Sequence, residues 1–270
     1  MDDLHQKYER LKAILRGMGS VAVAFSAGVD STFLLDTAVR VLGEKALAVT
    51  VQSAFFPSGE AAEAAAFCAR RSVRRVVLDV SVLDDDAITA NPPDRCYLCK
   101  RMILSAILES ARQHGIMTVA EGSNTDDLDD YRPGARAVRE LGVRSPLLEA
   151  GLSKQDIRTL SRESGLPTWD KPSFACLASR FACGERITAE KLTMVEKAEQ
   201  YLRGLGLRQV RVRVHGTLAR IETDVEEMPS LLNEACLRQI HDALRSLGFR
   251  YVTLDLGGYR AGSMNPIGSL

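Results

Sequence analysis

Hydrophobic positions along the first two thirds of the chain alternate between short apolar runs and stretches with helical spacing. A run over 21–25 predicts a buried strand, and apolar residues from Phe33 to Ala38 line one side of a helix that starts near Asp30. The same patterns predict further helices over 4–18, 61–70 and 102–114, and further strands over 47–51, 73–80 and 117–121. Strands that alternate with helices are typical of an α/β fold with a doubly wound parallel sheet.

The pattern changes near residue 167, where we predict a domain boundary. Ser153 is a suitable cap for a helix that Gly165-Leu166-Pro167 ends. Beyond it, helices are predicted over 189–204 and 231–247, and strands over 210–214, 218–222 and 251–256, with a hairpin turn at 216–217. We therefore expect a first α/β domain over 1–167 and a smaller C-terminal α+β domain over 168–270.

The first predicted strand runs into a turn of small residues, Ser26-Ala27-Gly28, and then into a helix. Such a junction offers backbone N–H groups at the positive end of a helix, where phosphate binds. Ser26 and Ser31 can add hydroxyl donors, and Asp30 can hold Mg²⁺ on the phosphates. An ordinary βα turn is the alternative. The string resembles the SGG[VI]DS loop of the ATP pyrophosphatases, with Ala27 in place of the first Gly, whereas the sequence has neither a Walker lysine nor a G-x-G-x-x-G.

Polar residues also follow two other predicted strands. Gln52 ends the second strand and Gly122 follows the fourth, at the edge where open α/β sheets place ligand groups. An acidic stretch over 126–130 and a Tyr-Arg-Pro-Gly string over 131–134 come next. The aspartates alone favour a solvated loop, but the position directly after a sheet strand favours a loop of a binding site.

Cysteines bring in a second kind of chemistry. In a cytosolic enzyme, metal or catalytic use of cysteine is favoured over a disulfide framework. Cys96 and Cys99 form a C-x-x-C around one expected bend, which is typical of a redox pair or half of a zinc site, but the sequence has no second C-x-x-C and no spaced His pair. With Cys176 or Cys183 as a third thiolate, the set could hold a 4Fe–4S cluster with one open iron. Cys68 and Cys236 are expected to be buried thiols.

Composition narrows the classes of function. The chain of 270 residues is 46% hydrophobic and 26% charged, which is the profile of a globular protein. Its 35 Lys and Arg equal its 35 Asp and Glu, which argues against a large nucleic-acid-binding surface. The acidic, polar start differs from a signal peptide, and no apolar run reaches membrane-spanning length. We therefore expect a cytoplasmic protein with no membrane and no nucleic-acid partner.

Motifs along nearly the whole chain resemble one family, the LarE-type ATP-dependent sulfur transferases that help to make the nickel-pincer cofactor of lactate racemase. The motifs occur in the expected order and comprise the loop over 26–31 and the segments 130–134, 176–181, 211–213 and 254–260. The resemblance implies that ATP adenylates a carboxylate of pyridinium-3,5-biscarboxylic acid mononucleotide and that pyrophosphate leaves. A sulfur nucleophile then displaces AMP, and the cycle repeats on the second carboxylate.

The resemblance implies one of two sulfur sources. In one branch of the family, a single Cys at the position of Cys176 gives up its own sulfur and becomes dehydroalanine. In the other, Cys at the positions of Cys96, Cys99 and Cys176 hold a 4Fe–4S cluster whose open iron carries a sulfide. This sequence resembles the cluster type, so sulfide or another sulfur donor is an expected partner. Cys183 stands where relatives commonly have an aromatic residue.

The resemblance also assigns roles by position. Lys100 and Arg180 are expected to act with Cys176 at the reacting carboxylate. The substrate phosphate is expected on Arg211, Arg213 and Arg260, with the acidic Glu199 and Glu222 nearby; solvated strand and helix surfaces are the alternative. ATP and Mg²⁺ are expected at Ser26, Gly28, Asp30, Ser31, Thr32, Gln52, Gly122, Asp127 and Arg132. Relatives assemble as trimers or hexamers, so a homo-oligomer is expected.

Three other interpretations share part of these features. A tRNA thiolase can share the loop and a three-cysteine cluster, but zero net charge and the lack of a separate RNA-binding module in the sequence favour a small-molecule substrate. An amide-forming ATP pyrophosphatase would need none of the cysteines. A nucleotide-binding module without enzymatic activity would release no pyrophosphate.

Overall fold

The computed structural model describes residues 3–128, 133–172, 175–260 and 262–264. The chain divides into two compact units. Unit 1 comprises residues 1–81 and 96–174, and unit 2 comprises residues 82–95 and 175–270. The segment 82–95 lies within the first of the two ranges expected from the sequence, yet it packs with the C-terminal residues. The assignment of nucleotide and substrate binding to separate domains stays a prediction.

Unit 1 is built on a four-stranded parallel sheet with the order β3-β2-β1-β4. The strands lie close to their predicted ranges and are β1 Val21–Ala24, β2 Ala46–Gln52, β3 Arg75–Asp79 and β4 Val119–Ala120. The register sets Val23 of β1 beside Ala48 of β2 and Ala120 of β4. Because all strands are parallel, the loops that leave their carboxyl ends gather at one edge of the sheet.

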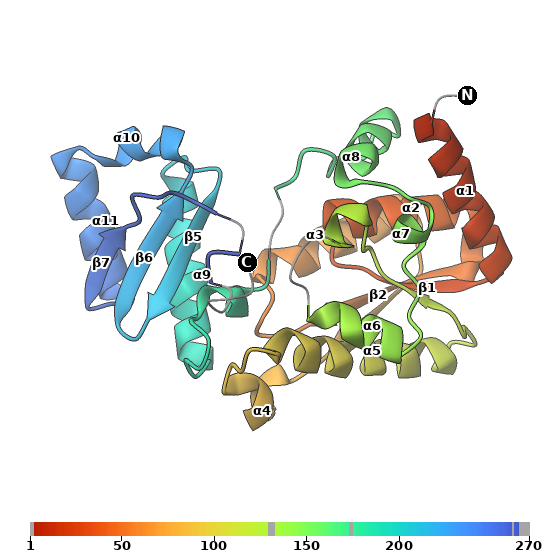
Figure 1. Cartoon of the computed structure of the whole chain (residues 1–270), viewed down its shortest axis with the longest axis horizontal. Helices are drawn as coiled ribbons and strands as arrows, with labels where there is room; N and C mark the ends of the chain where they lie inside the picture. Colours follow the sequence, from red (N-terminus) through yellow and green to blue (C-terminus); the bar gives the residue numbers. More distant parts are fainter. Residues whose placement is uncertain (1–2, 129–132, 173–174, 261, 265–270) are drawn as a thin grey trace. The chain divides into compact units, whose positions relative to one another are not determined.

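Helices cover both faces of this sheet (Figure 1). Side chains of successive strand residues point to opposite faces, so Val21 and Val23 join one buried cluster while Ala22 joins another. The first cluster includes residues of α1 Asp3–Met18, α2 Val29–Leu42, α3 Ser58–Arg70, α7 Pro146–Glu149 and α8 Lys154–Glu163. The second includes residues of α5 Arg95–Gln113 and α6 Gly134–Glu140. The predicted doubly wound α/β class is confirmed.

Helix α5 corrects one prediction, because it begins at Arg95 rather than at Met102. Tyr97 in its first turn is 7% exposed, and its hydroxyl donates to Glu140 of α6 at 2.7 Å. The burial of Tyr97 and its hydrogen bond to α6 extend the helix back through the C-x-x-C. Cys96 and Cys99 therefore do not flank a bend. They lie one turn apart on the same side of a helix.

Unit 2 contains a three-stranded sheet with the order β5-β6-β7. The strands are β5 Val210–His215, β6 Leu218–Thr223 and β7 Tyr251–Leu254, and β6 runs antiparallel to β5 and parallel to β7. The helices are α4 Asp86–Thr89, α9 Ala189–Gly204, α10 Met228–Leu231 and α11 Glu234–Ser246. This unit is the predicted smaller α+β fold.

The helix predicted over 231–247 is α11, which begins three residues later than predicted, at Glu234. Asn233 caps α11, and its side-chain oxygen accepts a hydrogen bond from the backbone of Cys236 at 2.9 Å. Cys236 is partly exposed, so the prediction of a core thiol is wrong there, whereas Cys68 is 3% exposed as expected. The asparagine cap fixes the first residue of α11, which is why the helix starts after the predicted position.

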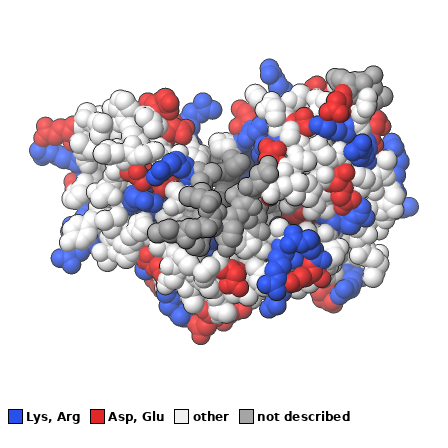
Figure 2. All heavy atoms as spheres, viewed as in Figure 1, with Lys and Arg blue, Asp and Glu red and all other residues white. Residues whose placement is uncertain are grey.

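Surface charge is mixed in the view of Figure 2, where basic and acidic side chains are interspersed on both units. This agrees with the formal net charge of zero. Within the described parts of the chain, no helix combines the length and apolar character needed to cross a membrane.

Candidate functional site

The loop between β1 and α2 has a backbone conformation that is uncommon for its sequence. Ala27 has φ of +56°, in the left-handed region, and its side chain is 2% exposed. A Cβ in this region costs roughly 1–2 kcal/mol relative to glycine, which is the residue at this position of the resembled loop pattern. Strained residues of this kind persist where the surrounding structure holds them, and they cluster at ligand-binding loops.

Helix α2 begins directly after this loop with Gly28 as its N-cap, and no side chain caps it. The Ser26 and Ser31 hydroxyls lie 3.2 Å apart, and the Ser31 hydroxyl also donates to the Gly28 carbonyl. The hydroxyls and the first-turn N–H groups together form a ready site for an anionic oxygen. Thr32, also predicted for this site, is fully buried.

Asp30 lies in the first turn of α2 and is contacted from two directions. Lys154 Nζ donates to Asp30 Oδ2 at 2.5 Å, and Asn124 Nδ2 donates to Oδ1 at 3.3 Å. Gly122 packs against the same turn. A side chain at position 122 would place its Cβ 3.1 Å from the Ser31 backbone nitrogen, so glycine is the residue that fits this close approach. The Asp30 carboxylate is 23% exposed, which leaves it accessible to a cation.

Lys100 of α5 lies at the end of β4, where it forms an ion pair with Glu121. Lys100 Nζ donates to Glu121 Oε2 at 3.0 Å, and the same carboxylate accepts from the hydroxyls of Ser123 and Ser145. Burial raises the pKa of Glu121, but the Lys100 charge and the two hydroxyls outweigh it, and the pKa is lowered overall. Glu121 is therefore an ionised carboxylate that fixes Lys100 at the carboxyl edge of the sheet.

The remaining predicted nucleotide residues lie around this edge of unit 1. Gln52 ends β2 with an exposed side chain. Asp127 lies in a short helical turn over Thr125–Leu128, where its carboxylate accepts from the backbone of Asn124 at 3.0 Å. Arg132 lies outside the described residues.

Lys171, in the segment after α8, also contacts the loop. Its Nζ donates to the Ala27 carbonyl at 3.2 Å and forms an ion pair with Glu63 of α3. The loop is thus flanked by two lysines, Lys154 at Asp30 and Lys171 at Ala27.

The cysteines predicted to bind a cluster belong to different units. Cys96 is exposed and Cys99 is half-buried at the start of α5 in unit 1, whereas Cys176 is half-buried in unit 2. Cys183 is exposed. Among the described residues, no group of three metal-ligating side chains comes together. The cluster therefore stays a prediction.

Arg180 is held in the interior of unit 2 by a two-pronged contact with Glu199. Its Nε and Nη2 donate to the two carboxylate oxygens at 2.7 and 2.9 Å, and both side chains are 1% exposed. Its Nη1 donates to the Cys176 carbonyl at 3.1 Å and to the Ser179 hydroxyl at 2.9 Å. Arg180 therefore fixes the backbone that carries Cys176.

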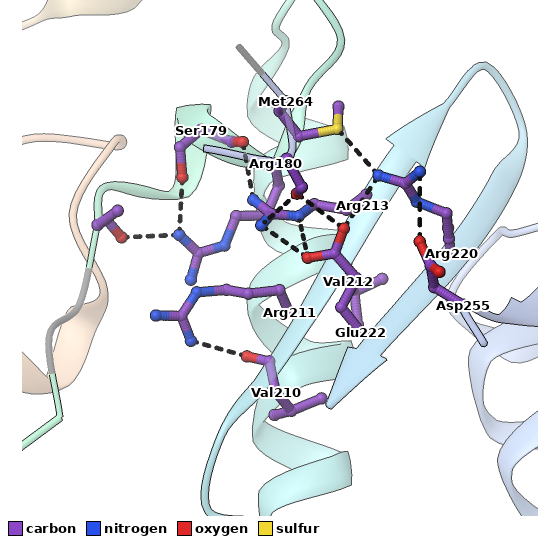
Figure 3. A network of polar contacts seen from close by, with 12 residues as sticks. Ser179, Arg180, Val210, Arg211, Val212, Arg213, Arg220, Glu222, Asp255 and Met264 are labelled. Atoms are coloured by element: carbon purple, nitrogen blue, oxygen red, sulfur yellow. Dashed lines mark hydrogen bonds and ion pairs between the residues drawn. The ribbon is translucent and has the colours of Figure 1, made fainter. Parts of the chain in front are cut away.

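A second buried pair, Arg213 and Glu222, joins β5 to β6 (Figure 3). Arg213 Nε and Nη2 donate to Glu222 Oε2 at 2.9 and 2.8 Å, and Nη1 donates to the Ser179 carbonyl at 3.1 Å. Arg220 pairs with the other oxygen of Glu222 at 3.0 Å. The alternative of a solvated strand face is wrong, since Arg213 is 5% exposed and Glu222 is fully buried.

Arg211 lies on the same side of β5 as Arg213 and is 2% exposed. Figure 3 shows its guanidinium group and that of Arg180 extending in the same direction. Burial, reinforced by the Arg180 charge, lowers the pKa of Arg211 to about 10. Arg211 also lies over the Tyr259 ring, 5.3 Å from its centre, whereas Arg260 is exposed. An anion beside Arg211 would relieve the cost of burying this charge.

The Arg180–Glu199 pair leads to a stability prediction. In Glu199→Gln, the buried guanidinium loses its counter-charge, so we expect the free energy of unfolding to fall by about 3–5 kcal/mol. Denaturant melts of the full chain measure this. The exposed pair Arg238–Glu234 supplies the control, because Glu234→Gln should change little. Equal effects of both substitutions would contradict the assignment.

The same pair predicts a pH dependence. Burial raises the pKa of Glu199, but Arg180 outweighs it and the pKa is lowered from 4.5. A lowered folded-state pKa gives stability that is present above the unfolded value and is lost as pH falls through the folded value. The difference in stability between wild type and Glu199→Gln should therefore shrink below about pH 4.5.

Sequence reasoning missed three charged residues at these sites. Glu121 carried a usable signal, because it ends a predicted strand at the edge where ligands bind. Lys154 and Lys171 carried none, since their contacts with Asp30 and Ala27 join positions far apart in sequence.

Comparison with known proteins gives matches along the whole chain, although no family model matches it. The chain is 40% identical to an uncharacterized protein of Synechocystis, over 98% of both chains. It is also 40% identical to the pyridinium-3,5-bisthiocarboxylic acid mononucleotide synthase of Lactiplantibacillus plantarum, over 98% of this chain and 96% of the synthase. A shorter match, 30% identical over 54% of this chain and 39% of the relative, is to the argininosuccinate synthase of Natronomonas pharaonis.

The parallel sheet, the loop between β1 and α2 and these relatives define an α/β protein of the PP-loop ATP pyrophosphatase class. Within that class, the chain belongs to the family of the pyridinium-3,5-bisthiocarboxylic acid mononucleotide synthase. The predicted family is confirmed, and with it the prediction of an enzyme.

Proposed function

We propose that this chain is an ATP-dependent sulfur transferase that converts pyridinium-3,5-biscarboxylic acid mononucleotide into its bisthiocarboxylic acid form. The full-length identity of 40% to the synthase named for that product carries the proposal. The reaction is chemically sound, because a carboxylate is a poor acyl donor until AMP is attached as a leaving group.

The nucleotide half of the reaction is assigned to the edge of the sheet in unit 1. The hydroxyls of Ser26 and Ser31 and the N terminus of α2 would hold ATP phosphates, and Asp30 would hold Mg²⁺. Bound Mg²⁺ supplies positive charge that helps pyrophosphate to leave. Lys100, fixed by Glu121, would add charge near the adenylated carboxylate.

The substrate phosphate is assigned to the arginines of unit 2. Arg213 directs its guanidinium to Glu222 and Ser179, so we assign it a positioning role. Arg211, whose pKa is lowered to about 10, gains most from an anionic partner. Arg260 remains a further proposed contact.

Arg211→Gln should therefore raise the KM for the dicarboxylate mononucleotide and leave the KM for ATP nearly unchanged. A charge-assisted hydrogen bond is worth about 1.5–3 kcal/mol, or roughly ten- to a hundredfold. Steady-state AMP release with each substrate varied in turn measures both constants. Arg250→Gln is the control, because Arg250 also lies over an aromatic ring, 5.5 Å from the centre of Tyr251, but is exposed. An equal rise in the KM for ATP and in the KM for the mononucleotide would contradict the assignment of Arg211 to the substrate phosphate.

Sulfur delivery is assigned to Cys96, Cys99 and Cys176. One observation supports this assignment: Cys96 and Cys99 lie one turn apart on the same side of α5, which suits two thiolate ligands of one cluster. A 4Fe–4S cluster on three thiolates would supply the transferred sulfur. The alternative is that Cys176 gives up its own sulfur.

The test of the proposed function is a reaction of purified protein with Mg-ATP, the dicarboxylate mononucleotide and sulfide under anaerobic conditions. We expect AMP, pyrophosphate and the thiocarboxylate product, identified by mass spectrometry. AMP release that depends on tRNA instead of the mononucleotide would contradict the proposal.

We further propose that the protein is cytoplasmic and forms a homo-oligomer. Sedimentation of the active protein tests the oligomeric state.

A further inference from the structure

Lys171 connects the segment after α8 to the loop that precedes α2. Its Nζ lies 3.2 Å from the Ala27 carbonyl and pairs with the Glu63 carboxylate, and its side chain is 17% exposed. The backbone of the same segment is anchored, because Arg158 donates to the carbonyls of Trp169 at 2.7 Å and Lys171 at 2.8 Å. The ammonium therefore reaches the loop from a segment whose backbone is held by Arg158 at two carbonyls.

The position of this ammonium suits a phosphate ligand. Ala27 lies between Ser26 and Gly28, so an anion held by the loop and the α2 N terminus lies next to the Ala27 backbone. A lysine ammonium has three rotatable N–H donors on a flexible stem and can turn from a carbonyl to a neighbouring anion. A hydrogen bond to a charged acceptor is roughly twice as strong as one to a neutral carbonyl. An occupied loop therefore attracts Lys171 away from Ala27.

Glu63 opposes this movement. Its carboxylate, on α3, is 55% exposed and pairs with the Lys171 ammonium. A pair with one exposed partner has little net stability, so it can be exchanged for a stronger contact. Glu63 thus keeps Lys171 beside the loop without binding it tightly.

We propose that Lys171 is a phosphate-binding residue of the nucleotide site. It pairs with Glu63 while the site is empty and contacts a phosphate when a nucleotide binds. The inference rests on the proposed use of ATP. Trp169 and Lys171 lie on one segment, whose backbone carbonyls Arg158 holds at both residues. When Lys171 turns to a bound phosphate, we therefore expect the surroundings of Trp169 on the same segment to change.

The first test measures binding of α,β-methylene-ATP with Mg²⁺ by calorimetry, since this analogue cannot be cleaved at the bond that adenylation breaks. Lys171→Met should weaken binding about tenfold, and Lys171→Arg should restore most of it. Glu63→Gln should strengthen binding, because it removes the competitor. Lys12→Met is the matched control, as Lys12 pairs with Glu9 on α1 and is similarly buried. Unchanged binding by Lys171→Met, or equal weakening in Lys171→Met and Glu63→Gln, would overturn the inference.

The second test uses Trp169, the one tryptophan of the sequence. Its ring is 37% exposed and lies 5.0 Å from the Arg162 guanidinium carbon, so its emission depends on the conformation of this segment. The analogue should change tryptophan fluorescence in wild type and in Lys12→Met but not in Lys171→Met. The same change in Lys171→Met would show that the segment responds without Lys171 and would refute the coupling.

The two proposals fail in different ways. If wild type does not bind the analogue, the proposed use of ATP is wrong. If wild type binds it and releases AMP from ATP, while Lys171→Met does both equally well, the proposed function stands and the role of Lys171 is refuted.

Discussion

Asp30→Asn is expected to abolish AMP formation while the protein keeps its fold. The carboxylate lies in the first turn of α2, is partly exposed and accepts hydrogen bonds from Lys154 and Asn124. An amide has the same shape but no charge, so it cannot hold Mg²⁺ on the phosphates as a carboxylate does. We expect a loss of at least about a hundredfold, the effect of removing one charge-stabilising group from an active site.

This result is measured as AMP and pyrophosphate released from ATP in the presence of the dicarboxylate mononucleotide. Asp126→Asn serves as a control, because Asp126 is an exposed carboxylate whose oxygen accepts from the Lys154 backbone. It should retain most of the activity, and both variants should keep the circular dichroism of wild type. Normal AMP formation by Asp30→Asn would refute the assignment of Mg²⁺ to this residue.

The second large effect concerns the cysteines. The double variant Cys96→Ala, Cys99→Ala should stop sustained sulfur transfer while adenylation continues, because a cluster needs both thiolates. Cys176→Ala should stop sulfur transfer as well, since Cys176 is required by either sulfur source. Cys183→Ala should be active. The anaerobic wild-type protein should be brown, with about four irons per chain as this cluster type requires.

Product formation over many turnovers, iron content and intact mass together distinguish the two routes. With the cluster route, the mass of the protein is unchanged after turnover. If wild-type protein without iron delivers one sulfur per chain and Cys176 becomes dehydroalanine, the cluster assignment is wrong and the sacrificial route is correct.

Features encoded by neighbouring residues were predictable. The bounds of α9 agree with the predicted 189–204, because Thr188 caps a long amphipathic stretch. The β5–β6 hairpin follows from two strand patterns around a glycine turn. The small-residue loop and the helix that begins beside Asp30 were equally local, so their place at the sheet edge followed from the α/β pattern.

Features that depend on distant residues were not predictable. Glu199 and Glu222 had surface positions as their alternative, yet Arg180 and Arg213 neutralise them in the interior. The early start of α5 depends on the contact of Tyr97 with Glu140 of another helix. Tertiary contacts of this kind override local propensity, and a single sequence has no local pattern that reports them.

The split of unit 2 between 82–95 and 175–270 has a consequence for biosynthesis. Asn91 donates to the Ala182 carbonyl at 2.7 Å, and its own carbonyl accepts from the backbone of Gly184 at 2.8 Å. During synthesis on the ribosome, the residues of 82–95 must keep these groups hydrated until the whole of 96–174 has followed. Unit 2 can therefore form only late in translation, through contacts of long sequence separation that are slow to close. A fragment expressed from residue 175 onward would leave the backbone around Gly184 without the chain that it pairs with.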